Sequence, residues 1–398
     1  MTTSVTLHRY SLSNKYYFTQ IQRNCQHEFQ FFFIAQRYKK CYNRLRVIFM
    51  NMIKEDIWNF VKHTEKPIII YGMGNGADKI MNELQRLGVP VTGVMASDDF
   101  VRGQTFRGFP VRKLSDFEKE LSELIIIIAF GSQREDVIEH LLSLARKHTV
   151  LAADVPVYGE NIFNMAFYDV HQKELQEVEK ILADDLSRKV LKNVVKFKLT
   201  GQMPYLTEVF SDKKEAFTIL KLTDQESYLD LGAYRGDTIE EFLHCTGGHY
   251  RHITALEPDR KTFRKLKDYA GTFPDTQLWN MGIWGSDCNL SFRNSLGRGS
   301  SVQNAGGQCL AVTKIDTLYQ IQQVSYIKMD VEGAEKQALS GGIHTLQRDK
   351  PKLNLALYHR SEDIFELPLL LHKIQPAYKI YLRQHPHIPA WDLNLYAI

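Results

Sequence analysis

The chain has 398 residues, enough for two domains of ordinary size, and 44% of them are hydrophobic, which excludes an intrinsically disordered chain. The formal net charge of +4 is uneven, because residues 1–49 hold eight basic residues against one acidic residue, which leaves −3 for the remainder. A mildly acidic body argues against nucleic-acid binding through a basic face, and no apolar run reaches the roughly 18 residues of a membrane span.

The five cysteines are odd in number and none of them forms a C-x-x-C pair. This pattern argues against a disulfide framework or a zinc site and is typical of a reducing compartment. We therefore expect a cytoplasmic protein. Residues 1–49 are expected to be a poorly ordered extension: a basic targeting arm, a nucleic-acid or membrane patch, or a stretch upstream of a true start at Met50 or Met52.

Residues 50–165 are predicted to form a Rossmann-like domain. The apolar run 67–71 predicts a buried strand, the glycine turn 72–76 follows it, and a helical pattern of apolar residues comes next. A second all-apolar run, 125–129, predicts another buried strand. Because strands alternate with helices in this part of the chain, we expect a parallel sheet.

A helical connector is predicted over residues 166–203, with Gly201 at the end of its last helix. The second domain is predicted over residues 204–398. Its expected strands are seven in number: 228–231, 253–256, 277–280, 326–330, 353–358, 379–382 and 393–397.

Two loops of the second domain stand out. Residues 294–307 are rich in Gly, Ser and Asn, and β-like segments flank them, so they predict a hairpin whose loop is a candidate lid over a pocket. Residues 384–387 contain His385 and His387 beside a proline and are expected to be an exposed loop, which makes His385 a weaker candidate for a substrate contact.

Residues 228–237 are the most informative segment, because an apolar strand ends there in a glycine turn that opens a helix. Gly232 allows the backbone to come close to a ligand, and Gly236 allows the helix start to pack against the strand. The next strand ends in Glu257, whose carboxylate can accept hydrogen bonds from both hydroxyls of a ribose. The turn and the spaced acid together predict a site for a nucleoside cofactor.

These motifs resemble those of the FkbM family of S-adenosylmethionine-dependent methyltransferases over most of residues 180–398. The resemblance is carried by the D-L-G-A string from Asp230, the L-E-P-D string from Leu256 and the K-M-D-V-E-G-A-E string from Lys328. It implies an α/β protein whose C-terminal domain is a seven-stranded class I methyltransferase fold with an inserted hairpin. It also implies S-adenosylmethionine as cofactor and O-methyl transfer to a hydroxyl of a saccharide or related metabolite. The pair Tyr234-Arg235 departs from the family, with little expected effect on cofactor binding.

Five residues at strand ends and helix starts are expected to bind the cofactor besides Gly236. Asp230 and Gly232 should line its methionine and ribose portions, Glu257 its ribose and Asp237 its methionine ammonium, with Asn280 near the adenine. Other interpretations remain for three of them. Asp237 could complement the helix dipole, Glu257 could be a surface acid, and Asn280 could stabilise a turn.

Asp330, Glu332 and His359 are the predicted catalytic residues. A carboxylate here could accept the proton of the acceptor hydroxyl, with a pKa raised by burial or by its neighbour. Strand alternation would place Lys328 on the same side, so a structural ion pair is the competing interpretation, and His359 could instead be a core histidine. Glu335 is expected to position the substrate. Asp330, Glu332 and His359 could also bind Mg²⁺, but nothing in their spacing demands it and no metal is predicted.

Residues 50–165 are similar to the N-terminal domain of sugar O-acyltransferases, which is associated with nucleotide-sugar or acyl-acceptor handling. The alternative function is an NAD-dependent oxidoreductase or a nucleotide-sugar-binding protein that uses the 72–76 turn, with Asp98 or Asp99 on the ribose. A third interpretation is a binding module whose catalytic half has decayed, against which the intact motifs argue. The expected partner is a small-molecule or saccharide acceptor, without nucleic acid or a membrane span, and a homo-oligomer is left open.

Overall fold

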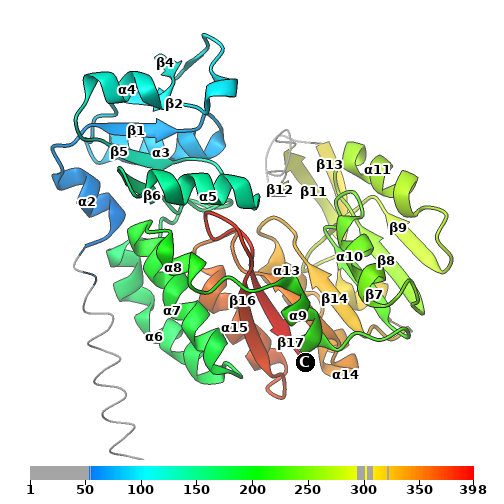
Figure 1. Ribbon diagram of the computed structural model, residues 1–398. Helices are drawn as coiled ribbons and strands as arrows, with labels where there is room; N and C mark the ends of the chain where they lie inside the picture. Colours follow the sequence, from blue (N-terminus) through cyan, green and yellow to red (C-terminus); the bar gives the residue numbers. More distant parts are fainter. Residues whose placement is uncertain (1–52, 54, 294–300, 303–307, 321) are drawn as a thin grey trace, which may run out of the picture. The chain divides into compact units, whose positions relative to one another are not determined.

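The computed structural model describes residues 53, 55–293, 301–302, 308–320 and 322–398 (Figure 1). These residues form three β-sheets. The predictions for residues 1–49 lie outside the described part of the chain. No helix within that part is both long and apolar enough to cross a bilayer.

The first sheet has six strands in the order β3-β4-β2-β1-β5-β6. Every pairing in it is parallel except that of β3 with β4. The parallel sheet predicted from residues 67–71 and 125–129 is therefore confirmed, and the isoleucine runs of β1 and β5 are fully buried, as expected for central strands covered on both faces. The strands are β1 (Ile68–Tyr71), β2 (Gly93–Met95), β3 (Thr105–Phe106), β4 (Phe109–Arg112), β5 (Ile125–Ile128) and β6 (Thr149–Ala152).

Helices of this first part alternate with its strands, which is the connection pattern of a Rossmann-like sheet. Gly76 in the first turn of α3 is needed for close packing, because a Cβ there would lie 2.7 Å from the carbonyl oxygen of Ala129 at the end of β5. The helices are α2 (Ile57–His63), α3 (Asn75–Arg86), the 3-10 helix η1 (Asp98–Phe100), α4 (Leu114–Glu120) and α5 (Glu135–Leu144).

A helical segment follows, with α6 (Met165–Ile181), α7 (Asp185–Thr200), α8 (Pro204–Thr207) and α9 (Lys213–Leu220). The predicted helix end at Gly201 is confirmed, since this residue caps α7 with a φ of 68°. Lys198 of α7 forms a salt bridge of 2.7 Å with Asp154, and both side chains are 3% exposed. Residues 55–398 form one compact unit, so the domain boundaries predicted within this range remain predictions.

The second sheet has seven strands in the order β16-β17-β15-β14-β7-β8-β9. Only β17 runs against the others; it lies beside β16, which is red in Figure 1. The strand order reverses between β7 and β14, and in open α/β sheets ligands bind at such a reversal, beyond the carboxyl ends of the strands. The strands are β7 (Ser227–Leu231), β8 (His252–Leu256), β9 (Thr276–Trp279), β14 (Tyr326–Met329), β15 (Lys352–Ala356), β16 (Ile380–Gln384) and β17 (Leu393–Ala397).

Six helices belong to this seven-stranded part. They are α10 (Asp237–Cys245), α11 (Arg260–Ala270), α12 (Ile315–Leu318), α13 (Glu335–Ser340), α14 (Ile343–Asp349) and α15 (Asp363–Ile374). The first of them begins directly after Gly236, as the glycine-turn pattern predicts.

The third sheet is the predicted insertion. Its strands β10 (Gly282–Ile283), β11 (Cys288–Arg293), β12 (Ser301–Val302) and β13 (Gln308–Thr313) lie in the order β10-β13-β11-β12. The pairing of β11 with β13 is antiparallel, so the hairpin prediction is confirmed. Apart from residues 301–302, the loop predicted as a lid lies outside the described residues.

The prediction of an exposed loop at residues 384–387 is wrong. His385 is 1% exposed and His387 is 7% exposed. The two ring nitrogens of His385 lie 2.8 Å from the carbonyl oxygen of Ser211 and 2.7 Å from the hydroxyl of Tyr396. His385 therefore has hydrogen-bond partners inside the protein and does not depend on contact with water.

Candidate active site

A cavity of about 270 Å³ opens at the carboxyl ends of β7, β8 and β14, where the strand order reverses. Five of the predicted site residues line it: Gly232, Asp237, Glu257, Asp330 and Glu332. The other four, Asp230, Gly236, Asn280 and His359, are not among the lining residues. The predicted site residues therefore fall into two sets: residues that line the cavity and residues that lie behind its lining.

The turn after β7 and the acid after β8 form one hydrogen-bonded unit. Glu257 accepts a hydrogen bond from the backbone N–H of Tyr234 at 3.0 Å and another from that of Asp259 at 2.8 Å. Each carboxylate oxygen keeps a second lone pair for a ligand. Burial raises the pKa of Glu257 to about 7. Tyr234, which departs from the family pattern, adopts a φ of 48° to place its N–H on this carboxylate.

Gly232 is required by a backbone contact. Its φ is 80°, and a Cβ on it would lie 1.9 Å from the carbonyl oxygen of Asp330. The absence of a side chain thus lets the turn after β7 lie directly against the end of β14. Gly236 is also required by a close contact, but with a different element. A Cβ on it would lie 2.4 Å from the ring of Tyr269 in α11, so Gly236 packs against that helix rather than against the strand.

Two residues that were predicted to bind the cofactor instead stabilise the structure around the cavity. Asp230 is fully buried and accepts a hydrogen bond from the hydroxyl of Thr238, and burial raises its pKa to about 6. Asn280 donates through Nδ2 to the carbonyl oxygens of Glu257 at 2.9 Å and Pro258 at 3.0 Å. These contacts agree with the turn-stabilising interpretation of Asn280 and hold Glu257 in place.

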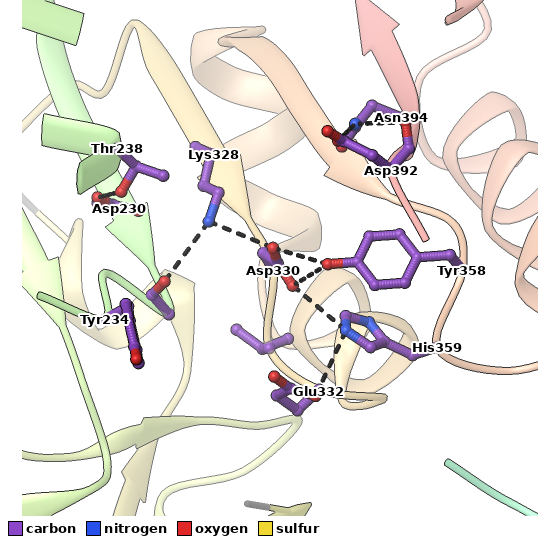
Figure 2. Close-up of polar contacts among 12 residues, drawn as sticks. Asp230, Tyr234, Thr238, Lys328, Asp330, Glu332, Tyr358, His359, Asp392 and Asn394 are labelled. Atoms are coloured by element: carbon purple, nitrogen blue, oxygen red, sulfur yellow. Dashed lines mark hydrogen bonds and ion pairs between the residues drawn. The ribbon is translucent and has the colours of Figure 1, made fainter. Parts of the chain in front are cut away.

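Figure 2 shows Asp330 between Lys328 on one side and Tyr358 and His359 on the other. Lys328 Nζ lies 3.7 Å from Asp330 Oδ2, which is the ion pair that the competing interpretation expected. The hydroxyl of Tyr358 donates to both carboxylate oxygens of Asp330, at 3.2 and 3.1 Å. Strand alternation does not extend to Glu332, because β14 ends at Met329 and Glu332 has a φ of 53°.

His359 is a buried bridge between carboxylates. Its Nε2 lies 3.3 Å from Asp330 Oδ1 and 3.6 Å from Glu332 Oε2, and its Nδ1 lies 2.8 Å from Glu335 Oε1. Burial lowers the pKa of His359, but the charges of Glu335, Asp330 and Glu332 outweigh it and raise that pKa to about 10. The ring is therefore an imidazolium at neutral pH and does not reach the cavity.

The pKa values of the two carboxylates beside His359 are shifted in opposite directions. Burial raises the pKa of Asp330, but the charges of Lys328 and His359 overcome this and hold it below its usual value. Burial raises the pKa of Glu332 to about 7, with help from the neighbouring Asp330 charge. A pair of acids whose pKa values are pushed apart is the usual basis for separate roles in proton transfer.

Asp330, Glu335 and His359 also form a group whose potential metal-binding atoms lie within 4.8 Å of one another. Within this group His359 is paired with both acids: its Nδ1 lies 2.8 Å from Glu335 Oε1 and its Nε2 lies 3.3 Å from Asp330 Oδ1.

His385, the weaker candidate for a substrate contact, lines the cavity, but sequence reasoning missed other residues of its lining. Gln133 lines it from the loop after β5, Trp391 and Asp392 line it from the segment that leads into β17, and Asn394 lines it from β17 itself. Neither segment carries a recognisable motif. The one available signal was Gly131, a glycine close behind the buried strand β5.

The family comparison matches residues 230–391 to the methyltransferase FkbM domain. Among solved structures, the chain is similar to the methyltransferase FkbM of Methylobacillus flagellatus KT, with 22% identity, a TM-score of 0.66 and coverage of 84% of this chain and 90% of that chain. Aeropyrum pernix fibrillarin, crystallised with natively bound S-adenosyl-L-methionine, shows 14% identity, a TM-score of 0.31 and coverage of 47% and 74%. No curated protein matches the chain.

The structural similarity to the Methylobacillus flagellatus protein supports the methyltransferase fold. The family match begins at residue 230, so the resemblance of residues 50–165 to sugar O-acyltransferases stays a prediction. The alternative of an oxidoreductase is not favoured. Asp98, one of its two candidate ribose ligands, forms a surface ion pair with Lys113 at 3.3 Å.

Proposed function

We propose that the chain, whose residues 230–391 match the methyltransferase FkbM domain, transfers a methyl group from S-adenosylmethionine to a hydroxyl of a saccharide or related metabolite. One observation carries the proposal. A single cavity joins the Gly232 turn and Glu257 to the carboxylates of Asp330 and Glu332. A donor and an acceptor can therefore meet in one place, which is what direct transfer requires.

The donor half of the cavity fits the cofactor in its residue types. When bound, S-adenosylmethionine supplies a methyl group that its sulfonium charge already activates. Glu257 keeps one lone pair on each oxygen for the ribose hydroxyls, and Gly232 offers bare backbone. Asp237 lines the cavity from the first turn of α10 and is the proposed partner of the methionine ammonium.

Glu332 is the proposed general base. It lines the cavity, and its pKa of about 7 allows it to take up the proton of a hydroxyl near neutral pH. Asp330, which stays ionised, presents a fixed negative charge toward the cavity, where it would favour a positively charged donor. His359 acts on both acids from behind the wall, so we assign it a positioning role rather than a direct one.

The acceptor half is polar and partly aromatic, with Gln133, Tyr358, Trp391, Asp392 and Asn394 around it. A few placed polar groups beside an aromatic surface are typical of small-molecule sites. This composition supports a neutral acceptor rich in hydroxyl groups.

Isothermal titration calorimetry with S-adenosylmethionine tests the donor site. At a pH above 8, where a carboxyl with a pKa of about 7 is ionised, the wild type should bind. Glu257→Gln should bind about 10- to 100-fold more weakly, because hydrogen bonds to a charged group are worth about 1.5–3 kcal/mol. Glu240→Gln is the matched control, since Glu240 is an exposed glutamate of α10 outside the cavity lining. Absence of binding to the wild type would refute the proposed function.

A further inference from the structure

The loop that follows β5 in the first sheet reaches the acceptor side of the cavity. Its residues 131–133, here called the 131–133 loop, end at Gln133, which lines the cavity. Ser132 and Ile388 exchange two backbone hydrogen bonds, of 2.9 and 3.0 Å. This antiparallel bridge fixes the loop of the first sheet against the segment that leads into β17.

Gly131 makes the contact close. A Cβ on Gly131 would lie 2.6 Å from Cε3 of Trp391 and 2.8 Å from Cε1 of His387. The backbone of the loop therefore packs directly on the indole ring, and the rings of Trp391 and His387 lie with their centroids 5.9 Å apart. The loop and His387 together hold Trp391 in one orientation at the cavity wall.

The groups around Trp391 have a consistent chemistry. Gln133 is exposed, and its side-chain amide has no hydrogen-bond partner in the part of the chain that the structure describes. Asn394 donates to Asp392 Oδ1 at 2.7 Å, which orients that carboxylate and leaves its other oxygen available. A planar indole with an amide and a carboxylate beside it matches a sugar ring, which offers C–H groups on its faces and hydroxyls at its edge.

We propose that the 131–133 loop completes a subsite for one sugar ring of the acceptor, with Trp391 under the ring and Gln133 on its hydroxyls. The first sheet would then determine which acceptor enters a site whose catalytic groups belong to the second sheet. This proposal deepens the proposed function and rests on it.

Saturation-transfer difference NMR tests the subsite, with the methyl glycosides of glucose, galactose, mannose and rhamnose as probes. The wild type should bind at least one of them. Gln133→Ala should weaken that binding about 3- to 10-fold, the loss expected for one neutral hydrogen bond. Gly131→Ala should weaken it more, because the added Cβ displaces Trp391.

Two variants are matched controls. Gln85→Ala removes an exposed glutamine of α3, and Gly74→Ala adds a Cβ with no atom within 4 Å at a turn of the same sheet. Both should bind the probes as the wild type does, and calorimetry should give the same S-adenosylmethionine affinity for all five proteins. If Gly131→Ala does not fold, Gln133→Ala alone decides.

Two results would overturn the subsite: no glycoside binds the wild type, or Gln133→Ala binds the probes as tightly as the wild type does. Either can occur while S-adenosylmethionine still binds, in which case the methyltransferase proposal stands. The methyltransferase proposal would be refuted by a separate result, the absence of S-adenosylmethionine binding to the wild type.

Discussion

Replacing His359 by glutamine should raise the pKa of Glu332. The imidazolium is 1% exposed and lies 3.6 Å from Glu332 Oε2, and its positive charge lowers the pKa of that carboxyl. Glutamine keeps a polar group beside Glu335 but removes the charge. Burial and the charge of Asp330, which both raise the pKa of Glu332, would then be opposed only by the charge of Lys328.

The size of the shift follows from the geometry. A unit charge at 3.6 Å from a carboxylate is worth about 4–5 kcal/mol at an effective dielectric constant of 20, which corresponds to about three pKa units. The charge is shared between two ring nitrogens, and the Glu332 side chain is 30% exposed, so solvent screens part of it. We therefore expect the pKa of Glu332 to rise from about 7 by about one to two units.

The assay is ¹³C NMR of the glutamate carboxyl carbons across a pH titration, with Glu332 assigned by the loss of its signal in Glu332→Gln. It needs no acceptor. Unfolding measurements give a second readout. The fold raises the pKa of His359 from 6.5 to about 10, so its stabilisation is complete below pH 6.5 and is lost as the pH rises through 10. His359→Gln should lack this loss. A Glu332 midpoint that stays the same or falls in a folded variant would refute the reasoning.

Two further predictions concern stability, measured by urea unfolding. Gly232→Ala should lower the free energy of unfolding by more than about 3 kcal/mol, because its Cβ meets the Asp330 carbonyl oxygen at 1.9 Å. Gly247→Ala is the control: with a φ of 64° and no atom near its Cβ, it should lower that free energy by about 1–2 kcal/mol through backbone strain alone. Equal losses in the two variants would contradict the steric account. Lys198→Met leaves Asp154 buried without its partner and should cost about 3–5 kcal/mol. As the control, Lys66→Met breaks the exposed pair with Glu123 and should change the free energy of unfolding by less than about 1 kcal/mol. An equally small effect of Lys198→Met would show that the buried pair does not stabilise the fold.

The donor side of the site could be predicted from the sequence because its requirements are local. Gly232 and Glu257 each follow a buried strand, and the roles of a bare turn and a strand-end acid depend on few residues. The structure adds a reason that no local pattern contains: Gly232 must be a glycine because Asp330, almost 100 residues later, places its carbonyl oxygen there.

The errors arise where hydrogen-bond partners come from distant segments. The polar residues after β16 suggested exposure, but His385 is satisfied by Ser211 and Tyr396, neither of which is a sequence neighbour. Gln133 and Trp391 were also missed, because they line one cavity only after folding brings the first sheet and the segment before β17 together.

The contact between Gly232 and Asp330 links the two halves of the proposed site. The turn that would hold the donor lies directly against the backbone that carries the acidic side chain of the acceptor half, and Lys328 strengthens the link by contacting both the Gly232 carbonyl oxygen, at 3.5 Å, and Asp330. A substitution that moves the turn must therefore also move Asp330. Donor binding and the alignment of the acceptor should accordingly fail together in Gly232→Ala, whereas Gln133→Ala should affect the acceptor alone.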